Sequence, residues 1–134
     1  MTLEEVKELS YEEIRIKVAE LLGWTRIHLD SDWQGVEEYT RSTVVGIPKN
    51  CVFIGSASYD ETPNYPEDLN ACYEMEERCY ESPEEWEAYG DHLMDCVVRD
   101  SGYQGADLLI HATARQRCEA FIMVMEAVNV KECE

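Results

Sequence analysis

The sequence predicts an α+β fold in which helices cover a small, mostly antiparallel sheet. Three observations lead to this expectation. A helical pattern opens the chain, a block of strand-like segments follows, and helical patterns fill the second half. Such an order of elements is typical of α+β layers. The 134 residues, 45% of them hydrophobic, are enough for one core, so we expect a single domain over residues 1–134.

The first long helix is predicted over residues 10–23. Ser10 and Glu13 form a capping box, apolar residues from Tyr11 to Leu22 make one stripe, and Gly23 supplies the C-terminal stop. Residues 2–9 form a separate short helical turn in this interpretation.

Strand patterns follow over residues 25–30 and 35–47, where apolar residues alternate or are β-branched. The segment SDWQG at 31–35 is predicted to be the turn between them, and CVFIG at 51–55 is a further short strand candidate. Residues 58–68 contain two prolines and an asparagine, which favour a loop.

Three more helices are predicted in the second half. They cover residues 68–80, 82–98 and the region from 113 onward, each opened by a capping residue: Asp68, Ser82 and Thr113. The apolar stripe of the second of these helices includes Trp86, and that of the last includes Phe121. Residues 101–110 contain turn glycines and a short apolar run that fits a last edge strand.

The charge of the chain narrows the classes of partner. Eleven Lys and Arg stand against 29 Asp and Glu, for a formal net charge of −18. Direct binding of nucleic acid is not expected, because it relies on cations that neutralise phosphates. Two interpretations of the acidic surface stay open. It serves solubility alone, or it imitates a polyanion and occupies the basic groove of another protein.

Cysteine usage and hydropathy indicate where the protein acts. The six cysteines contain no CxxC pair and fall mostly at helix-core positions, which favours a reducing cytoplasm over a disulfide framework. No signal peptide opens the chain, and no apolar run approaches the roughly 18 residues of a membrane span. We expect no membrane association.

The start of the last helix is the strongest candidate for a site. His111, Arg115 and Arg117 bring cationic groups close to a predicted capping box of Thr113 and Gln116. A helix N-terminus already attracts anions, so these side chains together suit a phosphate or carboxylate. The alternative is that the arginines only balance nearby acids such as Glu119.

Four aromatic residues could offer a stacking surface for a base: Trp24, Trp33, Tyr65 and Tyr103. Core packing is the competing explanation for each of them. His92 and Cys96 have the i, i+4 spacing of metal ligands, but no third or fourth ligand is suggested, so no metal is expected. No nucleophile–base pair or phosphate loop occurs, so neither an enzyme nor a cofactor is expected.

Three stretches occur together in a known family: VAELLGW, PNYPEDLNACYEMEE and HATARQRCEAFIMVM. In order and spacing they make the chain resemble the phage ABA sandwich domain family, small proteins of bacteriophages and prophages. The resemblance spans nearly the whole chain. It implies a three-layer α/β/α sandwich and a viral origin, and it implies no catalytic motif.

These observations favour a non-catalytic binding protein of a bacteriophage, acting in the cytoplasm of the host bacterium. It would hold a small anionic, nucleotide-like ligand and thereby sequester a host immune signal. The alternative is an acidic protein that inhibits a host nucleic-acid-binding enzyme by polyanion mimicry.

The spacing of the two arginines leads to a further expectation. Because Arg115 and Arg117 cannot face one side of their helix, a shared ligand favours a homo-oligomer in which two helix starts meet. Replacing both by Ala is then expected to abolish ligand binding and to leave the fold intact.

Overall fold

The computed structural model describes residues 1–34, 40–55, 58–102 and 111–133, without the side chains of residues 32, 34, 40, 41 and 129–133. The elements in chain order are α1 (Leu3–Lys7), α2 (Tyr11–Leu21), β1 (Thr25–Gln34), β2 (Thr40–Ile47), β3 (Asp60–Glu61), α3 (Leu69–Cys79), α4 (Pro83–Ser101) and α5 (Ala114–Cys133).

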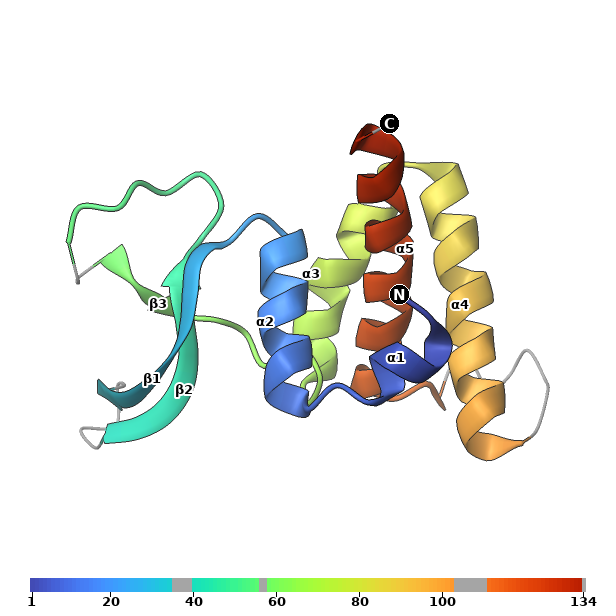
Figure 1. Cartoon of the computed structure of the whole chain (residues 1–134), viewed down its shortest axis with the longest axis horizontal. Coiled ribbons are helices and arrows are strands. Elements are labelled where there is room, and N and C mark those ends of the chain that lie inside the picture. Colours follow the sequence, from blue (N-terminus) through green and yellow to red (C-terminus); the bar gives the residue numbers. More distant parts are fainter. Residues whose placement is uncertain (35–39, 56–57, 103–110, 134) are drawn as a thin grey trace.

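Helix α5 is the centre of the helical part of the molecule. Each of α1, α2, α3 and α4 packs against it, and α4 runs antiparallel beside it (Figure 1). The strands form a three-stranded antiparallel sheet in the order β1-β2-β3. Helix α2 contacts both β1 and β2 and so joins the sheet to the helices. The expected α+β class with a small antiparallel sheet is confirmed.

The family resemblance implies a three-layer α/β/α sandwich, in which the sheet lies between two helical layers. The observed order of layers differs from this. In the parts of the chain that the structure describes, the helices lie together on one side of the sheet (Figure 1). The reason is that α5 buries apolar side chains against all four of the other helices, so these helices pack around α5 on one side of the sheet.

The helix starts follow the capping chemistry read from the sequence. Ser10 and Glu13 form the reciprocal capping box of α2, Asp68 caps α3, and Ser82 caps α4 with Pro83 at the first helical position. Gly23 follows α2 with a φ of +99°, a conformation that costs glycine little.

The sheet departs from the predicted strands in two places. β1 runs on through Trp33, so the expected turn at 31–35 is wrong, and residues 35–39 lie outside the described part. Two irregularities of register let the strand continue, and Arg26 adopts a φ of +52° at the first. The expected strand at 51–55 is also wrong, because Asp60 and Glu61 pair with β2 instead and leave Ile54 87% exposed.

The core lies among the helices, and β2 supplies the buried strand of the sheet. Phe121, Ile122 and Met125 of α5 are buried against Cys72 and Met75 of α3 and against apolar residues of α2 and α4. In α3, Met75 is fully buried and Tyr73 is 57% exposed. In α4, Trp86 is 40% exposed and stacks on Tyr89.

The expected edge strand at 101–110 lies almost wholly outside the described residues. Ser101 ends α4 and Gly102 follows with a φ of +70°, while residues 103–110 are not described. Among the helices that are described, none combines the length and the apolar character needed to cross a membrane.

Candidate anion site at the start of α5

The capping box at the start of α5 is confirmed. Thr113 Oγ1 accepts a hydrogen bond from the Gln116 backbone N–H at 3.1 Å, and Gln116 Oε1 accepts one from the Thr113 N–H at 2.9 Å. The first N–H groups of a helix have no partner within it, and they carry the positive end of the helix dipole. Ala114 and Arg115 therefore present their N–H groups at this end.

A hollow of about 620 Å³ opens beside this helix start. It lies where the end of α1, the start of α2, the end of α4 and the start of α5 come together. Its lining residues are Lys7, Leu9, Ser10, Tyr11, Arg99, Asp100, Thr113, Arg115, Gln116 and Glu119.

Arg115 joins three elements around the hollow. Its Nη2 donates to the backbone carbonyl oxygens of Lys7 at 3.0 Å, at the end of α1, and of Leu9 at 2.6 Å, just beyond it. Its guanidinium lies 4.8 Å from the centre of the Tyr11 ring, a cation–π contact. Its Nε lies 3.9 Å from Glu119, so the arginine is held in one orientation at the wall of the hollow.

Arg99 neutralises the carboxylates of the hollow. It donates to both oxygens of Glu119 at 3.0 Å and to both oxygens of Asp100 at 2.7 and 2.9 Å. The guanidinium hydrogen bonds, with one from Gln116, hold the pKa of Asp100 below its ordinary value. Hydrogen bonds from Arg99 to Asp100 and Glu119 in turn raise the pKa of Arg99.

The charge of the lining is positive in a strongly negative protein. Among the described residues, Lys7, Arg99 and Arg115 face Asp100 and Glu119, three cations against two carboxylates. Both carboxylates already accept hydrogen bonds from Arg99, and Glu119 is 1% exposed. Lys7 is exposed and Arg115 partly so, which leaves positive charge open to solvent.

Of the nine residues expected at the site, Thr113, Arg115 and Gln116 line the hollow. His111 is exposed ahead of α5 and is not among the lining residues. Arg117 lies on the other flank of the helix, where Nε donates to the Ala112 carbonyl oxygen at 3.1 Å and Nη1 lies 3.2 Å from Glu76. The structure therefore does not bring the two arginines to one ligand within a chain.

The aromatic candidates lie elsewhere. Tyr65 is 1% exposed, its burial raises the pKa of its hydroxyl, and Trp24 is partly buried. Both pack in or against the core. Trp33 lies in β1 opposite Arg41, and Figure 1 shows β1 away from α5. Tyr103 is outside the described residues.

The aromatic side chain that does line the hollow is Tyr11, which sequence reasoning had placed in the apolar stripe of α2. It is 50% exposed instead, because the first helical position after the Ser10 cap points away from the core. Lys7 and Arg99 were missed as well. The available signal was that each lies in the last turn of its helix, α1 or α4, where the helix dipole favours a cation.

The positive charge and the N–H groups of this arrangement suit an anion. In the described part of the chain, no three side chains of His, Cys, Asp or Glu are grouped as a metal ion requires. Comparisons with protein-family models, with curated proteins and with solved structures gave no match. The resemblance to the phage ABA sandwich domain family thus stays a prediction.

Proposed function

We propose that the protein is a non-catalytic binding protein that holds a small anionic, nucleotide-like ligand in the hollow at the start of α5. The observation that carries this proposal is the charge of the hollow. In a chain of net charge −18, three cationic side chains and a helix N-terminus meet there. In the setting that the sequence predicts, a bacteriophage protein in its host's cytoplasm, such binding would sequester a host immune signal.

The size and lining of the hollow support a nucleotide rather than a bare phosphate. Its volume of about 620 Å³ lies within the range typical of small-molecule sites. A phosphate would lie against Lys7, Arg115 and the N–H groups at the start of α5. The half-exposed ring of Tyr11 would stack on the base, and Arg115 already fixes that ring.

A thermal-shift panel tests the proposal. The protein is mixed with cyclic mono-, di- and trinucleotides and with ADP-ribose derivatives. A ligand at about 100 times its dissociation constant adds about 2.7 kcal/mol to the free energy of unfolding, which raises the melting temperature by several degrees. A panel in which no compound raises the melting temperature would reject the proposal.

Lys7 gives the sharpest variant, because it lines the hollow and is exposed, so its replacement leaves the core intact. Lys7→Gln should weaken binding about tenfold, since one direct phosphate contact is lost. Lys49→Gln, in the turn that follows β2, makes the same charge change at an exposed position. Equal weakening by the two variants would mean that the ligand senses only net charge and not this hollow.

A homo-oligomer remains part of the proposal, but Arg115 and Arg117 no longer supply the reason for it. Arg117 is held by Glu76 within its own chain, so two copies would share a ligand only by facing their hollows toward each other. Light scattering with and without ligand measures this. A monomer under both conditions would remove the oligomer from the proposal and leave the ligand site standing.

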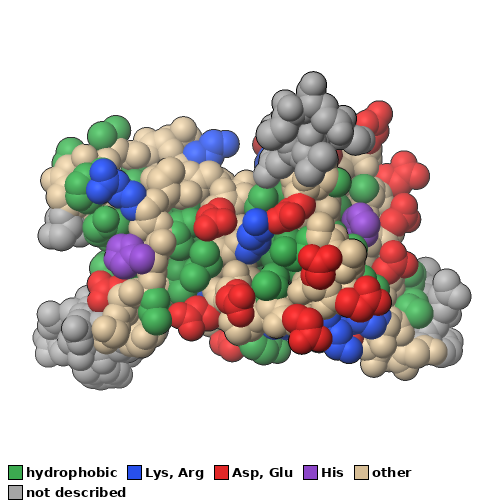
Figure 2. Space-filling view, viewed as in Figure 1, with side chains coloured by type: hydrophobic (Ala, Val, Ile, Leu, Met, Phe, Trp, Pro, Cys, Tyr) green, Lys and Arg blue, Asp and Glu red, His purple; other side chains and the backbone are tan. Residues whose placement is uncertain are grey.

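Polyanion mimicry is the second candidate function, and it is favoured by the acidic helical surface. From residue 60 to residue 95 the chain has 13 acidic residues and one basic residue, Arg78. Figure 2 shows carboxylates spread over the visible face of the helical half. A basic partner should be captured from host lysate at low salt and released at high salt. Charge reversal at Glu77 and Glu84 that leaves capture unchanged would reject this function.

A further inference from the structure

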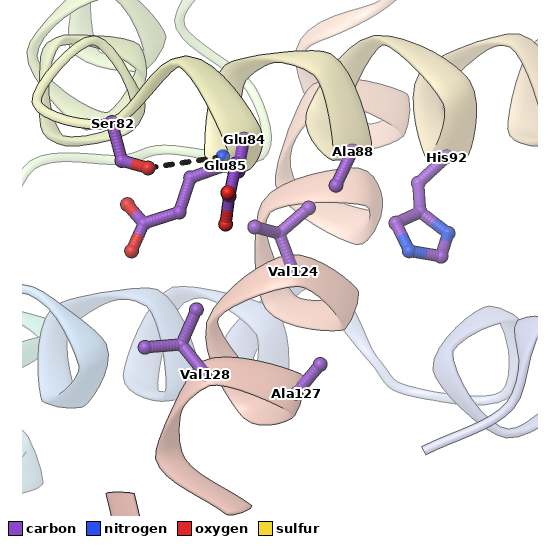
Figure 3. A pocket seen from close by; sticks show the side chains of 8 residues that line it. All are labelled: Ser82, Glu84, Glu85, Ala88, His92, Val124, Ala127 and Val128. Atoms are coloured by element: carbon purple, nitrogen blue, oxygen red, sulfur yellow. Dashed lines mark hydrogen bonds between the residues drawn. The ribbon is translucent and has the colours of Figure 1, made fainter. Parts of the chain in front are cut away.

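A second depression runs between α4 and α5, far from the start of α5. It has a volume of about 330 Å³ and lies where the first half of α4 faces the last turns of α5 (Figure 3). We call it the α4–α5 groove. Glu84, Ala88 and His92 line it from α4 at a spacing of four residues, so they form one ridge roughly 12 Å long.

The floor of the groove is apolar and its rim is acidic. Ala88 faces Val124 and Val128 of α5, and the short alanine side chain leaves the space between the helices unfilled (Figure 3). At one end lie Glu84, which is exposed, and Glu85, which accepts a hydrogen bond from Arg78 at 2.7 Å.

His92 marks the other end of the groove with an unsatisfied polar atom. Its Nδ1 is buried and has no hydrogen-bond partner among the described residues, and its ring points to the same side of α4 as the glutamates (Figure 3). A buried polar atom without a partner costs free energy. His92 and Ala127 also border a further hollow of about 220 Å³, so the depression continues toward Met1.

We propose that the α4–α5 groove binds a basic amphipathic helix of a partner protein. An apolar face of such a helix would lie on Ala88, Ala127 and Val128, which keep accessible surface, as a third helix does against an antiparallel pair. Its Lys or Arg side chains would meet Glu84 and the neighbouring exposed acids of α4, Glu87 and Asp91. The inference is independent of the anionic ligand.

Charge complementarity favours a cationic partner helix over a second copy of the chain. A net charge of −18 makes two copies repel each other, and like charges across an interface are costly. A cationic helix is attracted by the same field. Two turns of helix match the roughly 12 Å length of the ridge.

The test uses a synthetic 15-residue peptide labelled with fluorescein, with Leu at i, i+3, i+4 and i+7 and Lys elsewhere. A shuffled peptide of the same composition, without an apolar face, is the control. Fluorescence anisotropy should report binding of the first peptide at least about tenfold tighter than of the second. Ring resonances of His92 should shift during the same titration followed by NMR.

Substitutions in and outside the α4–α5 groove test whether the peptide binds there. Ala127→Trp places a large side chain at the exposed edge of the floor and should weaken binding about tenfold. Glu84→Lys should weaken it more than Glu20→Lys, which makes the same charge change on α2. Ala127→Lys gives the same test as Ala127→Trp if the tryptophan variant does not fold.

Three results would overturn the proposal. The shuffled peptide binds as tightly as the amphipathic one, or Glu20→Lys weakens binding as much as Glu84→Lys, or His92 resonances stay unchanged while the peptide binds. Self-association of the free protein that Ala127→Trp abolishes would also overturn it, because a second copy would then cover the groove.

Discussion

Arg117 of α5 and Glu76 of α3 meet at 3.2 Å in the helical core, where their side chains are 13% and 7% exposed. Glu76 also accepts a hydrogen bond from the Tyr89 hydroxyl of α4 at 2.8 Å. The pair therefore joins three helices around a carboxylate that is nearly removed from water.

Replacement of Arg117 by Leu should destabilise the protein strongly. The Glu76 carboxylate would stay buried with its cationic partner gone, and breaking one side of a buried ion pair costs about 3 kcal/mol or more. Urea denaturation measures the free energy of unfolding. This differs from the sequence-based expectation that loss of both arginines leaves the fold intact, because that expectation placed them on an exposed helix start.

The double variant Glu76→Gln with Arg117→Leu is the matched control. Glutamine keeps a hydrogen-bond acceptor for Tyr89 and removes the buried charge, so at least half of the lost stability should return. If Arg117→Leu alone unfolds at the same urea concentration as the parent, the pair contributes nothing and the interpretation is wrong.

Alkylation of the native protein should distinguish the exposed from the buried cysteines among the described residues. Cys51 is exposed, whereas burial raises the pKa of Cys79 and of Cys96 to about 12. At about pH 8 such thiols hold on the order of a thousandfold less reactive thiolate than a free cysteine. Peptide mapping after brief iodoacetamide treatment should find label on Cys51 and little on Cys79 or Cys96. Equal labelling of the three would contradict the burial that we describe.

Asp100 should make the free energy of unfolding depend on pH in the acidic range. Hydrogen bonds from Arg99 lower its pKa in the folded protein, so its charged form is favoured there. This contribution is present above the unfolded pKa of about 3.9 and is lost as pH falls through the folded pKa. Asp100→Asn should therefore be less stable than the parent at about pH 6, and the difference should shrink toward about pH 2. A difference that stays constant with pH would show that charge on Asp100 plays no part.

Two glycine substitutions should have opposite effects. Gly23 has a φ of +99°, and an added Cβ would lie 3.0 Å from Lys49 Cδ, so Gly23→Ala should cost about 1 kcal/mol. Gly90 lies inside α4 with open space where a Cβ would go, so Gly90→Ala should stabilise by about 0.5–1 kcal/mol. Thermal unfolding of both variants checks the signs. Stabilisation by Gly23→Ala would contradict the backbone described for the end of α2.

Local chemistry explains what could be read from the sequence. The capping residues Ser10, Asp68, Ser82 and Thr113 act within three residues of themselves, so the helix starts follow from the sequence alone. Strand pairing depends on distant residues. The apolar segment 51–55 has the pattern of a strand, yet the pair Asp60–Glu61 takes the edge of β2. Nothing local to either segment decides between them.

The residues of the candidate site also fall into two groups: those that local sequence could predict and those that depend on tertiary packing. Thr113, Arg115 and Gln116 belong to one turn of helix and were found together. Lys7, Tyr11 and Arg99 come from three other elements and reach the hollow only because the helices pack around α5. The side of the helix that Arg117 occupies depends on Glu76, 41 residues earlier, which periodicity cannot supply.

Amide NMR of the ligand hollow is the most direct test of the proposed binding. The ¹⁵N-labelled protein is titrated with the cyclic nucleotides and ADP-ribose derivatives to about 1 mM, well above the dissociation constant of a specific ligand. We predict that at least one compound shifts the amide signals of Ala114, Arg115 and Gln116 in a saturable manner, and that Lys7→Gln weakens this response while Lys49→Gln does not. Amide signals at the start of α5 that stay in place with every compound would contradict the proposed function.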